Sequence, residues 1–287
     1  MKILIATDGK KHSENAIAFV GNLFQAIKPQ ITVLHVHPTD RESEETVEQA
    51  KIYLERAEEI LASFKIKIRK KIIKEGNIVK EILKESRLGS YDMLAIGSER
   101  LSSVISSLTE SILEDDHQQI ARNLKISLLV VKDSSTEVKN VLLCTDGSVM
   151  AEAAIEFWGR LRKKQQPLAT ILNIIPKAFV RFSDELSRHK DEFLKVLSTF
   201  GGPRTEAVEK GQKILDRYSI EAKTILRERK YASEEILKEE KDGHYDLIIM
   251  GYRGRDHRGE QMGCQSLDVV QKSKSSVLIF KFSKAKK

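Results

Sequence analysis

Short apolar runs alternate with amphipathic stretches along the first half of the chain. The runs have the length and residue content of buried strands, and the apolar residues between them recur at helical spacing. The pattern predicts strands at residues 3–6, 31–36, 66–72, 93–96 and 128–131. It predicts helices at residues 16–27, 41–63 and 77–87, and another that ends near residue 123.

The third of these strands has its own pattern. Ile66, Ile68 and Ile72 alternate with lysines and arginines. Alternation of this kind is typical of a strand with one exposed face. We therefore expect it at the edge of the sheet.

Five strands alternate with four helices, which favours an α/β fold with a parallel sheet and helices on both faces. Short connections and right-handed crossovers restrict the topology to a doubly wound sheet. Ligands of such sheets bind at the carboxyl ends of the strands, where the winding direction reverses.

The second half repeats this plan. KILIATDG at 2–9 returns as NVLLCTDG at 140–147, and YDMLAIG at 91–97 returns as YDLIIMG at 245–251. A repeat that contains the start and end of a domain indicates tandem duplication. We expect domains at 1–133 and 139–287, joined by a short polar linker. Strands are expected at 140–145, 169–175, 219–226, 245–250 and 276–281, and a helix at 182–217 with a break at residues 201–203, Gly-Gly-Pro.

Composition fits two globular domains. The 287 residues are 40% hydrophobic and 32% charged, without an apolar run near the roughly 20 residues of a membrane span. The first residues do not resemble a signal peptide. Two cysteines, Cys144 and Cys264, are too few for a disulfide framework and fit a reducing compartment, so the prediction is cytoplasmic.

Positive charge is concentrated in the second half. Residues 1–138 hold 20 Lys and Arg against 21 Asp and Glu, whereas the rest hold 29 against 21. A basic half can attract nucleic acid or polyphosphate. Solvated helix surfaces explain it better, because no aromatic RNA-binding strand or recognition helix is visible. Nucleic acid and membrane are therefore not expected as partners.

Asp8 and Asp146 end the first strand of each half in the same Thr-Asp-Gly sequence. A carboxylate there can accept hydrogen bonds from an adenine amino group or a ribose hydroxyl. The alternative is a turn residue, because Asp-Gly is a common turn pair. Recurrence at the same place in both halves favours a shared site.

A glycine-rich loop follows the fourth strand of the second half. Gly251, Gly254 and Gly263 let the backbone approach a ligand closely, and the next helix offers its N-terminus to an anion. Arg253 can neutralise phosphate. Without the rest of the pattern, the same sequence is equally typical of an ordinary flexible loop that binds no ligand.

These motifs resemble the universal stress protein family over essentially the whole chain. The family's pattern after the fourth strand is G-x2-G-x9-G-[S/T]. Gly251, Gly254, Gly263 and Cys264 match it with eight intervening residues in place of nine, and with cysteine in place of Ser or Thr. The resemblance implies a five-stranded parallel sheet of order 3-2-1-4-5 in each half, ATP as ligand with or without Mg²⁺, and a role in stress responses.

The resemblance also implies a place for each part of the nucleotide. Adenine would lie near Cys144, Asp146, Ile174 and Met250. The triphosphate would lie along Gly251, Gly254, Gly263, Cys264 and Gln265.

The first half departs further from the pattern. Arg100 stands where the second glycine is expected, and Glu110 stands beside the surviving Ser111, where its charge would repel a phosphate. Weaker binding is therefore expected there, with Asp8, Val36, Gly97 and Ser111 as candidates.

Three functions remain open from the sequence. The leading one is a nucleotide-binding stress-response regulator that binds ATP mainly in the second domain. The others are an interaction module without nucleotide and a slow ATPase, although no catalytic residue can be assigned. His35 and His37 share a strand face that can bind metal, but no further ligand is evident, so an ordinary strand end is preferred and no metal site is predicted.

The resemblance also bears on assembly. Subunits of the family often pair through their last strands. We therefore expect the two halves to form an internal pseudo-dimer through residues 127–131 and 276–281. A homodimer and an unidentified protein partner remain open.

Overall fold

The structure is a computed structural model, and it describes most of the chain. The described residues are 1–38, 46–98, 124, 126–132, 136–161, 168–175, 206–228, 231–252 and 264–281. They divide into two compact units. The first consists mainly of Met1–Glu137 and Ser276–Lys287, and the second mainly of Val138–Gly259 and Gly263–Ser275.

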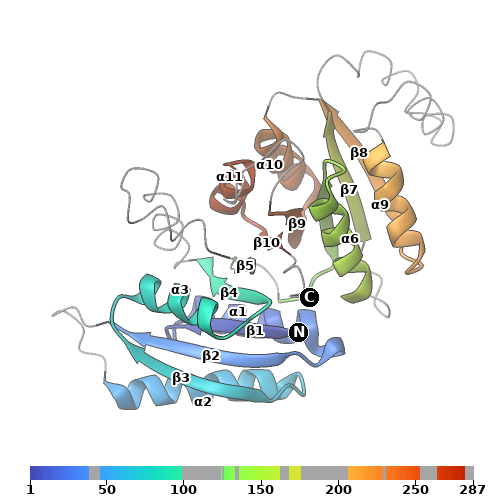
Figure 1. Ribbon diagram of the computed structural model, residues 1–287. Coiled ribbons are helices and arrows are strands. Elements are labelled where there is room, and N and C mark those ends of the chain that lie inside the picture. Colours follow the sequence, from blue (N-terminus) through green and yellow to red (C-terminus); the bar gives the residue numbers. More distant parts are fainter. Residues whose placement is uncertain are drawn as a thin grey trace. The chain divides into compact units, whose positions relative to one another are not determined.

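The first unit is built on a sheet whose four crossover-connected pairs are parallel, as its strand pattern predicts (Figure 1). The last strand of the chain, β10, belongs to this unit and is antiparallel to β5. Its elements are β1 (Lys2–Thr7), α1 (Lys11–Phe24), β2 (Gln30–His37), α2 (Val47–Ser63), β3 (Ile68–Glu75), α3 (Ile78–Leu88), β4 (Met93–Gly97), β5 (Ser127–Val131) and β10 (Ser276–Phe280).

The second unit repeats the arrangement. β6 lies between β7 and β9, and β8 pairs with β7, all in parallel. Helices α6 and α9 contact one another, as do α10 and α11. The elements are β6 (Asn140–Thr145), α6 (Val149–Leu161), β7 (Leu168–Ile175), α9 (Glu206–Asp216), β8 (Ala222–Glu228), α10 (Ala232–Gly243), β9 (Leu247–Gly251) and α11 (Cys264–Lys272).

The strand order confirms the predicted fold class. It is β3-β2-β1-β4-β5 in the first half of the sequence and β8-β7-β6-β9-β10 in the second. Both are the order 3-2-1-4-5. Central strands are apolar throughout because helices cover both of their faces, and every residue of β4 and β5 is buried.

β3 lies at the edge of the first unit's sheet, as predicted (Figure 1). One face is largely exposed, as predicted, because Arg69, Lys71 and Glu75 are exposed on it, although helices α2 and α3 both contact the strand. Lys71 pairs with Glu58 of α2, and Lys74 pairs with Glu85 of α3 at 2.9 Å. Lys71 and Lys74 are an odd number of positions apart, so α2 and α3 cover opposite faces.

The predicted pairing of the two last strands is confirmed. Val277 lies opposite Val130 and Leu278 opposite Leu129. The hydroxyl of Ser127 closes one end of the pair, accepting from the amide of Lys281 at 3.1 Å and donating to its carbonyl at 3.0 Å.

Some predicted boundaries differ. The first helix ends one turn earlier than expected, at Phe24, and a 3-10 turn leads to Lys28 at φ 48°. Predicted strand 219–226 is observed at Ala222–Glu228. Of the predicted helix 182–217, α9 is seen. Its break, the helix before residue 123 and the residues of the linker at 133–135 lie outside the described residues. Within the described chain, no helix is long and apolar enough to cross a membrane.

Candidate functional site

The Thr-Asp-Gly sequences form the same turn in both units. The amide of Gly9 donates to Thr7 Oγ1 at 3.2 Å, and the amide of Gly147 donates to Thr145 Oγ1 at 3.1 Å. Both glycines have φ of +72°, which favours glycine over any other residue. The repeated sequence is therefore a repeated backbone geometry.

Both aspartates take part in these turns. Asp8 Oδ1 accepts from the amide of Lys10 at 3.1 Å, and Asp146 Oδ1 accepts from the amide of Ser148 at 3.0 Å. This is an Asx turn. The turn interpretation is thus confirmed for both residues, and any contact of theirs with a ligand would be additional to it.

In the second unit, the strand register brings several candidates to one end of the sheet. Cys144 pairs with Leu172, which lies two residues before Ile174 on β7. Leu143 pairs with Ile249, which directly precedes Met250 on β9. Asp146 follows β6 directly. The carboxyl ends of β7, β6 and β9 therefore carry Cys144, Asp146, Ile174, Met250 and Gly251.

These residues differ in exposure. Cys144 and Met250 are buried, whereas Asp146, Ile174 and Gly251 are partly exposed. Burial, and next the negative charge of Glu239, raises the pKa of the Cys144 thiol. This cysteine is therefore a neutral core residue and not a reactive thiolate.

The first unit has the same register, but a side chain covers its turn. Asp8 and Val36 end neighbouring strands, and Gly97 ends β4 on the other side of β1. The ring of Tyr53 from α2 lies against Gly9, since a Cβ atom at Gly9 would be 2.1 Å from Tyr53 Cδ1. An aromatic ring thus occupies the space over the first turn.

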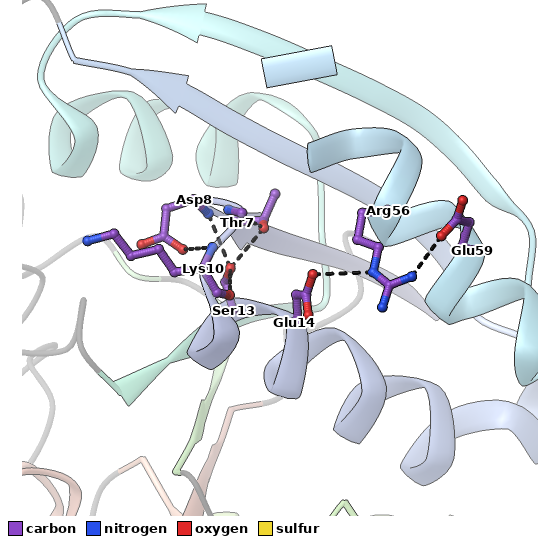
Figure 2. Close-up of polar contacts among 8 residues, drawn as sticks. Thr7, Asp8, Lys10, Ser13, Glu14, Arg56 and Glu59 are labelled. Carbon is purple, nitrogen blue, oxygen red and sulfur yellow. Dashed lines mark hydrogen bonds and ion pairs between the residues drawn. The ribbon is translucent and has the colours of Figure 1, made fainter. Parts of the chain in front are cut away.

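A hydroxyl network fastens this turn to α1 (Figure 2). Thr7 Oγ1 and Ser13 Oγ are 3.0 Å apart, and Ser13 Oγ donates to the carbonyl of Lys10 at 2.9 Å. The next residue of α1, Glu14, contacts Arg56 of α2, which also contacts Glu59. In the second unit, Ser148 instead caps α6 by accepting from the amide of Ala151 at 3.2 Å.

The glycines that end the fourth strands have a packing role. A Cβ atom at Gly97 would lie 2.8 Å from the carbonyl oxygen of His12, and one at Gly251 would lie 3.1 Å from the amide of Ala151. In the first unit the start of the helix approaches this strand too closely for a larger residue, and in the second a larger residue would require a shift of a few tenths of an ångström. Helix packing therefore accounts for Gly97 and favours glycine at position 251 as well.

Gln265 is engaged by the protein itself. Its Oε1 accepts from the amide of Ser233 in the first turn of α10 at 2.7 Å, and Ser233 Oγ donates to Asp268 at 3.0 Å. A hydrogen bond from Lys272 in particular holds the pKa of Asp268 below its usual range, against a smaller effect of burial. Together these side chains tie α11 to α10.

The remaining phosphate-loop candidates cannot be placed. Arg253, Gly254, Gly263, Ser111 and the departures Arg100 and Glu110 lie outside the described residues. Cys264 begins α11.

His35 is a core histidine. It is fully buried, its Nδ1 lies 3.0 Å from the carbonyl oxygen of Thr7, and its ring centroid is 5.4 Å from that of Tyr53. In the part of the chain that the structure describes, no group of three or more His, Cys, Asp or Glu could hold a metal ion.

Each unit also contains a polar cluster that the sequence analysis missed. Tyr91 donates to Glu85 at 3.0 Å, and Lys74 pairs with the same carboxylate. In the second unit, Tyr245 donates to Glu239 at 3.0 Å, and Arg227 pairs with that carboxylate. A sequence feature that could have indicated these clusters is the glutamate six residues before the tyrosine in both halves.

The clusters shift the ionisation of their members. Burial raises the pKa of Glu85, but the hydrogen bonds from Lys74 and Tyr91 together outweigh it, so the pKa is lowered. Burial, followed by the charge of Glu239, raises the pKa of Tyr245 to about 12, against the usual 10.0.

Tyr245 makes the second unit sensitive to alkali. Between pH 10 and about 12 the unfolded chain releases the phenolic proton and the folded protein retains it, so stability falls as pH rises through this window. Tyr245→Phe should flatten the decline in urea-unfolding free energy, whereas Tyr231→Phe, at a residue 46% exposed, should leave it unchanged. An unaltered profile in Tyr245→Phe would contradict the assignment.

A cavity of about 850 Å³ adjoins the second cluster. Thr170, Arg227, Glu239 and Tyr245 contribute to its wall, as does Asn140, the first residue of β6. Arg227 pairs with Ile174 near the carboxyl end of β7, so the cavity runs along the strands. Cys144, Asp146 and Met250 of the candidate ligand site do not contribute to its wall.

The fold has been solved in other proteins. A universal stress protein from Archaeoglobus fulgidus DSM 4304 is 19% identical, with a TM-score of 0.62 and 98% of each chain covered. A protein of unknown function from Pseudomonas aeruginosa PAO1 is 12% identical, with a TM-score of 0.59, covering 98% of this chain and 92% of its own. No curated protein matches the sequence significantly.

The family assignment rests on the sequence. The model of the universal stress protein family matches residues 1–132 and again residues 137–281. The two matches reproduce the internal repeat and span nearly the whole chain. The chain therefore belongs to the universal stress protein family, in its tandem two-domain form.

Proposed function

We propose that this protein binds ATP, with or without Mg²⁺, mainly in its second half, and acts as a stress-response regulator in the cytoplasm through an unidentified protein partner. One observation carries the proposal. Asp146 and Gly251 end the adjacent strands β6 and β9, where the winding of the second half reverses. This is where doubly wound sheets bind ligands.

The sequence around that point supports a nucleotide. Gly254, Gly263 and Cys264 follow Gly251 at nearly the family's spacing, and α11 begins at Cys264. A glycine-rich loop that leads into a helix N-terminus suits a phosphate chain. Cys144, Ile174 and Met250 provide apolar or weakly polar surface for adenine beside Asp146.

The first half is the weaker candidate. Tyr53 lies against Gly9, where the corresponding ligand would approach Asp8. Arg100 and Glu110 also replace residues of the loop pattern. Both features favour the second half.

The paired aspartates supply a matched test. Asp146→Ala should weaken ATP binding at least about tenfold in isothermal titration, the effect of losing one hydrogen bond to a charged group. Asp8→Ala removes the same Asx turn from the first unit and should change the affinity little. Because both variants lose the same local hydrogen bond, a difference between them reports on the ligand and not on the turn.

Two outcomes would count against this assignment. Equal weakening by the two substitutions would mean that the halves share binding. No heat at millimolar ATP, with folded protein, would remove nucleotide binding altogether.

A second candidate is an interaction module without nucleotide. Gln265 favours it, because its side chain is engaged with the first turn of α10. Mass spectrometry of small molecules released from the purified, denatured protein separates the two. Stoichiometric adenine nucleotide supports ATP binding, and phosphate release over many turnovers would point to a slow ATPase.

A further inference from the structure

Positive charge is concentrated along β3 of the first unit. Residues 65–74, here called the basic edge, contain six lysines and arginines and no carboxylate, although residues 1–138 as a whole are nearly neutral. All but Lys74 are exposed. The six are Lys65, Lys67, Arg69, Lys70, Lys71 and Lys74.

The protein compensates only part of this charge. Lys71 pairs with Glu58, and Lys74 pairs with Glu81 and Glu85. The guanidinium of Arg69 contacts the uncharged amide of Gln30.

The other cations lack a direct partner, although the carboxylate of Glu85 also attracts Lys70. Among the described residues, Lys65, Lys67 and Lys70 form no ion pair and no side-chain hydrogen bond. They are close in sequence, with Lys70 on β3 and Lys65 and Lys67 in the segment that leads into it, so their fields add within a Debye length of about 8 Å.

The same strand offers free backbone groups. Within the described chain, β3 pairs with β2 alone. Residues Lys70 to Glu75 run in unbroken register with Thr32 to His37, after an irregularity at the start of the strand. Alternate N–H and C=O groups of an edge strand point away from its neighbour and can pair with an added strand.

We propose that the basic edge binds an acidic, extended segment of a partner protein, which adds to β3 as a further strand. The backbone of the segment pairs with Lys70 to Glu75. Its carboxylates lie beside Lys67, Arg69 and Lys70. Lys70 and Lys71 point to opposite faces of the sheet, so acidic residues on either face of the segment meet a cation.

Charge decides which strand is accepted. Opposite charges on facing strands attract and like charges repel. A second copy of the basic edge, or a neutral aggregating strand, gains nothing from the cations, whereas an acidic strand does. The lysines that protect the edge from self-association thus select the partner.

A single-stranded nucleic acid fits less well. Such ligands are held by aromatic side chains on which bases stack, and residues 65–75 contain none. A nucleic acid also cannot form the ladder of backbone hydrogen bonds that β3 offers.

The test uses the full chain and a fluorescein-labelled octapeptide of alternating glutamate and valine. Fluorescence anisotropy should show saturable binding that weakens with salt. The same peptide with lysine in place of glutamate should not bind. A glutamate peptide that is N-methylated at every second residue keeps its charge but loses the ladder, and should bind at least about tenfold more weakly.

Two double variants localise the site. Lys67→Glu with Lys70→Glu should weaken peptide binding at least about tenfold. Lys238→Glu with Lys241→Glu makes the same charge change at two exposed lysines of α10 and should leave binding unchanged. Lys67→Ala with Lys70→Ala, which adds no charge, provides an intermediate case if the first variant folds poorly by circular dichroism.

Three results would overturn the proposal. The N-methylated peptide could bind as tightly as the parent, which would reduce the contact to charge alone. The α10 control could weaken binding as much as the β3 variant. A thymidine oligonucleotide could bind more tightly than the peptide and compete it away, which would make the basic edge a nucleic-acid surface.

Discussion

Replacement of Glu240 by alanine should destabilise the second unit by about 2–4 kcal/mol, measured by equilibrium unfolding in urea. Glu240 is a buried carboxylate near the end of α10. Its Oε1 accepts from the amide of Lys274 at 2.8 Å, the amide of Ser275 at 2.6 Å and the hydroxyl of Ser273 at 2.7 Å. One side chain therefore satisfies the loop that connects α11 to β10.

The expected loss of stability in Glu240→Ala follows from the hydrogen-bond donors that lose their acceptor. Ser273 Oγ also reaches the carbonyl of Ser275 at 2.9 Å, so its hydroxyl keeps an acceptor. The two amides have no such alternative among these contacts. Ser275 is buried, and an unsatisfied buried amide costs about 1–3 kcal/mol, whereas Lys274 is exposed and its amide adds less. Alanine is a better helix former than glutamate by a few tenths of a kcal/mol, which opposes the loss only slightly.

A conservative variant separates the hydrogen bonds from the charge. Glu240→Gln keeps a carbonyl oxygen at the position of the acceptor and should cost less than half as much as Glu240→Ala. Glu55→Ala, at an exposed helical glutamate, should lie within about 0.5 kcal/mol of the parent. Hydrogen exchange at the Ser275 amide should accelerate in Glu240→Ala, and an unchanged rate would contradict the mechanism.

The fold could be predicted because its signals are local and repeated. Apolar runs such as Ile3–Ala6 mark strands, and the Thr-Asp-Gly sequence marks the same turn twice. Both depend on the residue and its immediate neighbours. Strand order followed from the handedness of crossovers and from the family resemblance, and the observed order agrees.

Contacts between distant segments could not be predicted in the same way. Tyr53 lies on α2, and nothing near it in sequence indicates that its ring covers Gly9. Gln265 suggested a phosphate contact from its place in the loop pattern, but its partner Ser233 lies 32 residues away. These roles depend on how helices approach strands, which side-chain packing determines.

The repeated Glu and Tyr of the two polar clusters are visible in the sequence, but their spacing does not predict that they meet. Glu85 and Tyr91 recur as Glu239 and Tyr245 at the same spacing, yet residues six apart do not share a helix face, and neither segment has the pattern of a strand. The helix ends between the two residues, and the tyrosine returns to the helix from the following loop. Only the third element, β3 or β8, supplies the cation that completes the cluster.

The two halves therefore share the backbone geometry of the turn and differ in the residues around it. The turns at Gly9 and Gly147 have the same φ, and both aspartates accept from the amide two residues on. The differences are the ring of Tyr53, which lies over the first turn, and the sequence after the fourth strand, which keeps Gly254 and Gly263 in the second half only. Because the turns and the strands before them are unchanged, a change in the ligand site costs the domain little stability.

Leu278→Asp should prevent stable folding of the first unit, because it places a carboxylate inside the pair of strands β5 and β10. Leu278 and the facing Leu129 are both fully buried. A buried charge without a partner costs several kcal/mol beyond the lost packing, which is comparable with the total stability of a domain, about 5–15 kcal/mol. Leu278→Ala, which only opens a cavity, should cost about 2–5 kcal/mol.

Leu88 provides the matched control, since it is a leucine that is 70% exposed on the same unit. Leu88→Ala should change the urea midpoint little, and Leu88→Asp should be folded. Circular dichroism and hydrogen exchange of the β5 amides would report the loss in Leu278→Asp. If that variant kept the exchange protection of Leu128 to Val130, β5 would hold its structure without β10. The last strand would then be an addition to the first unit and not a part of its core.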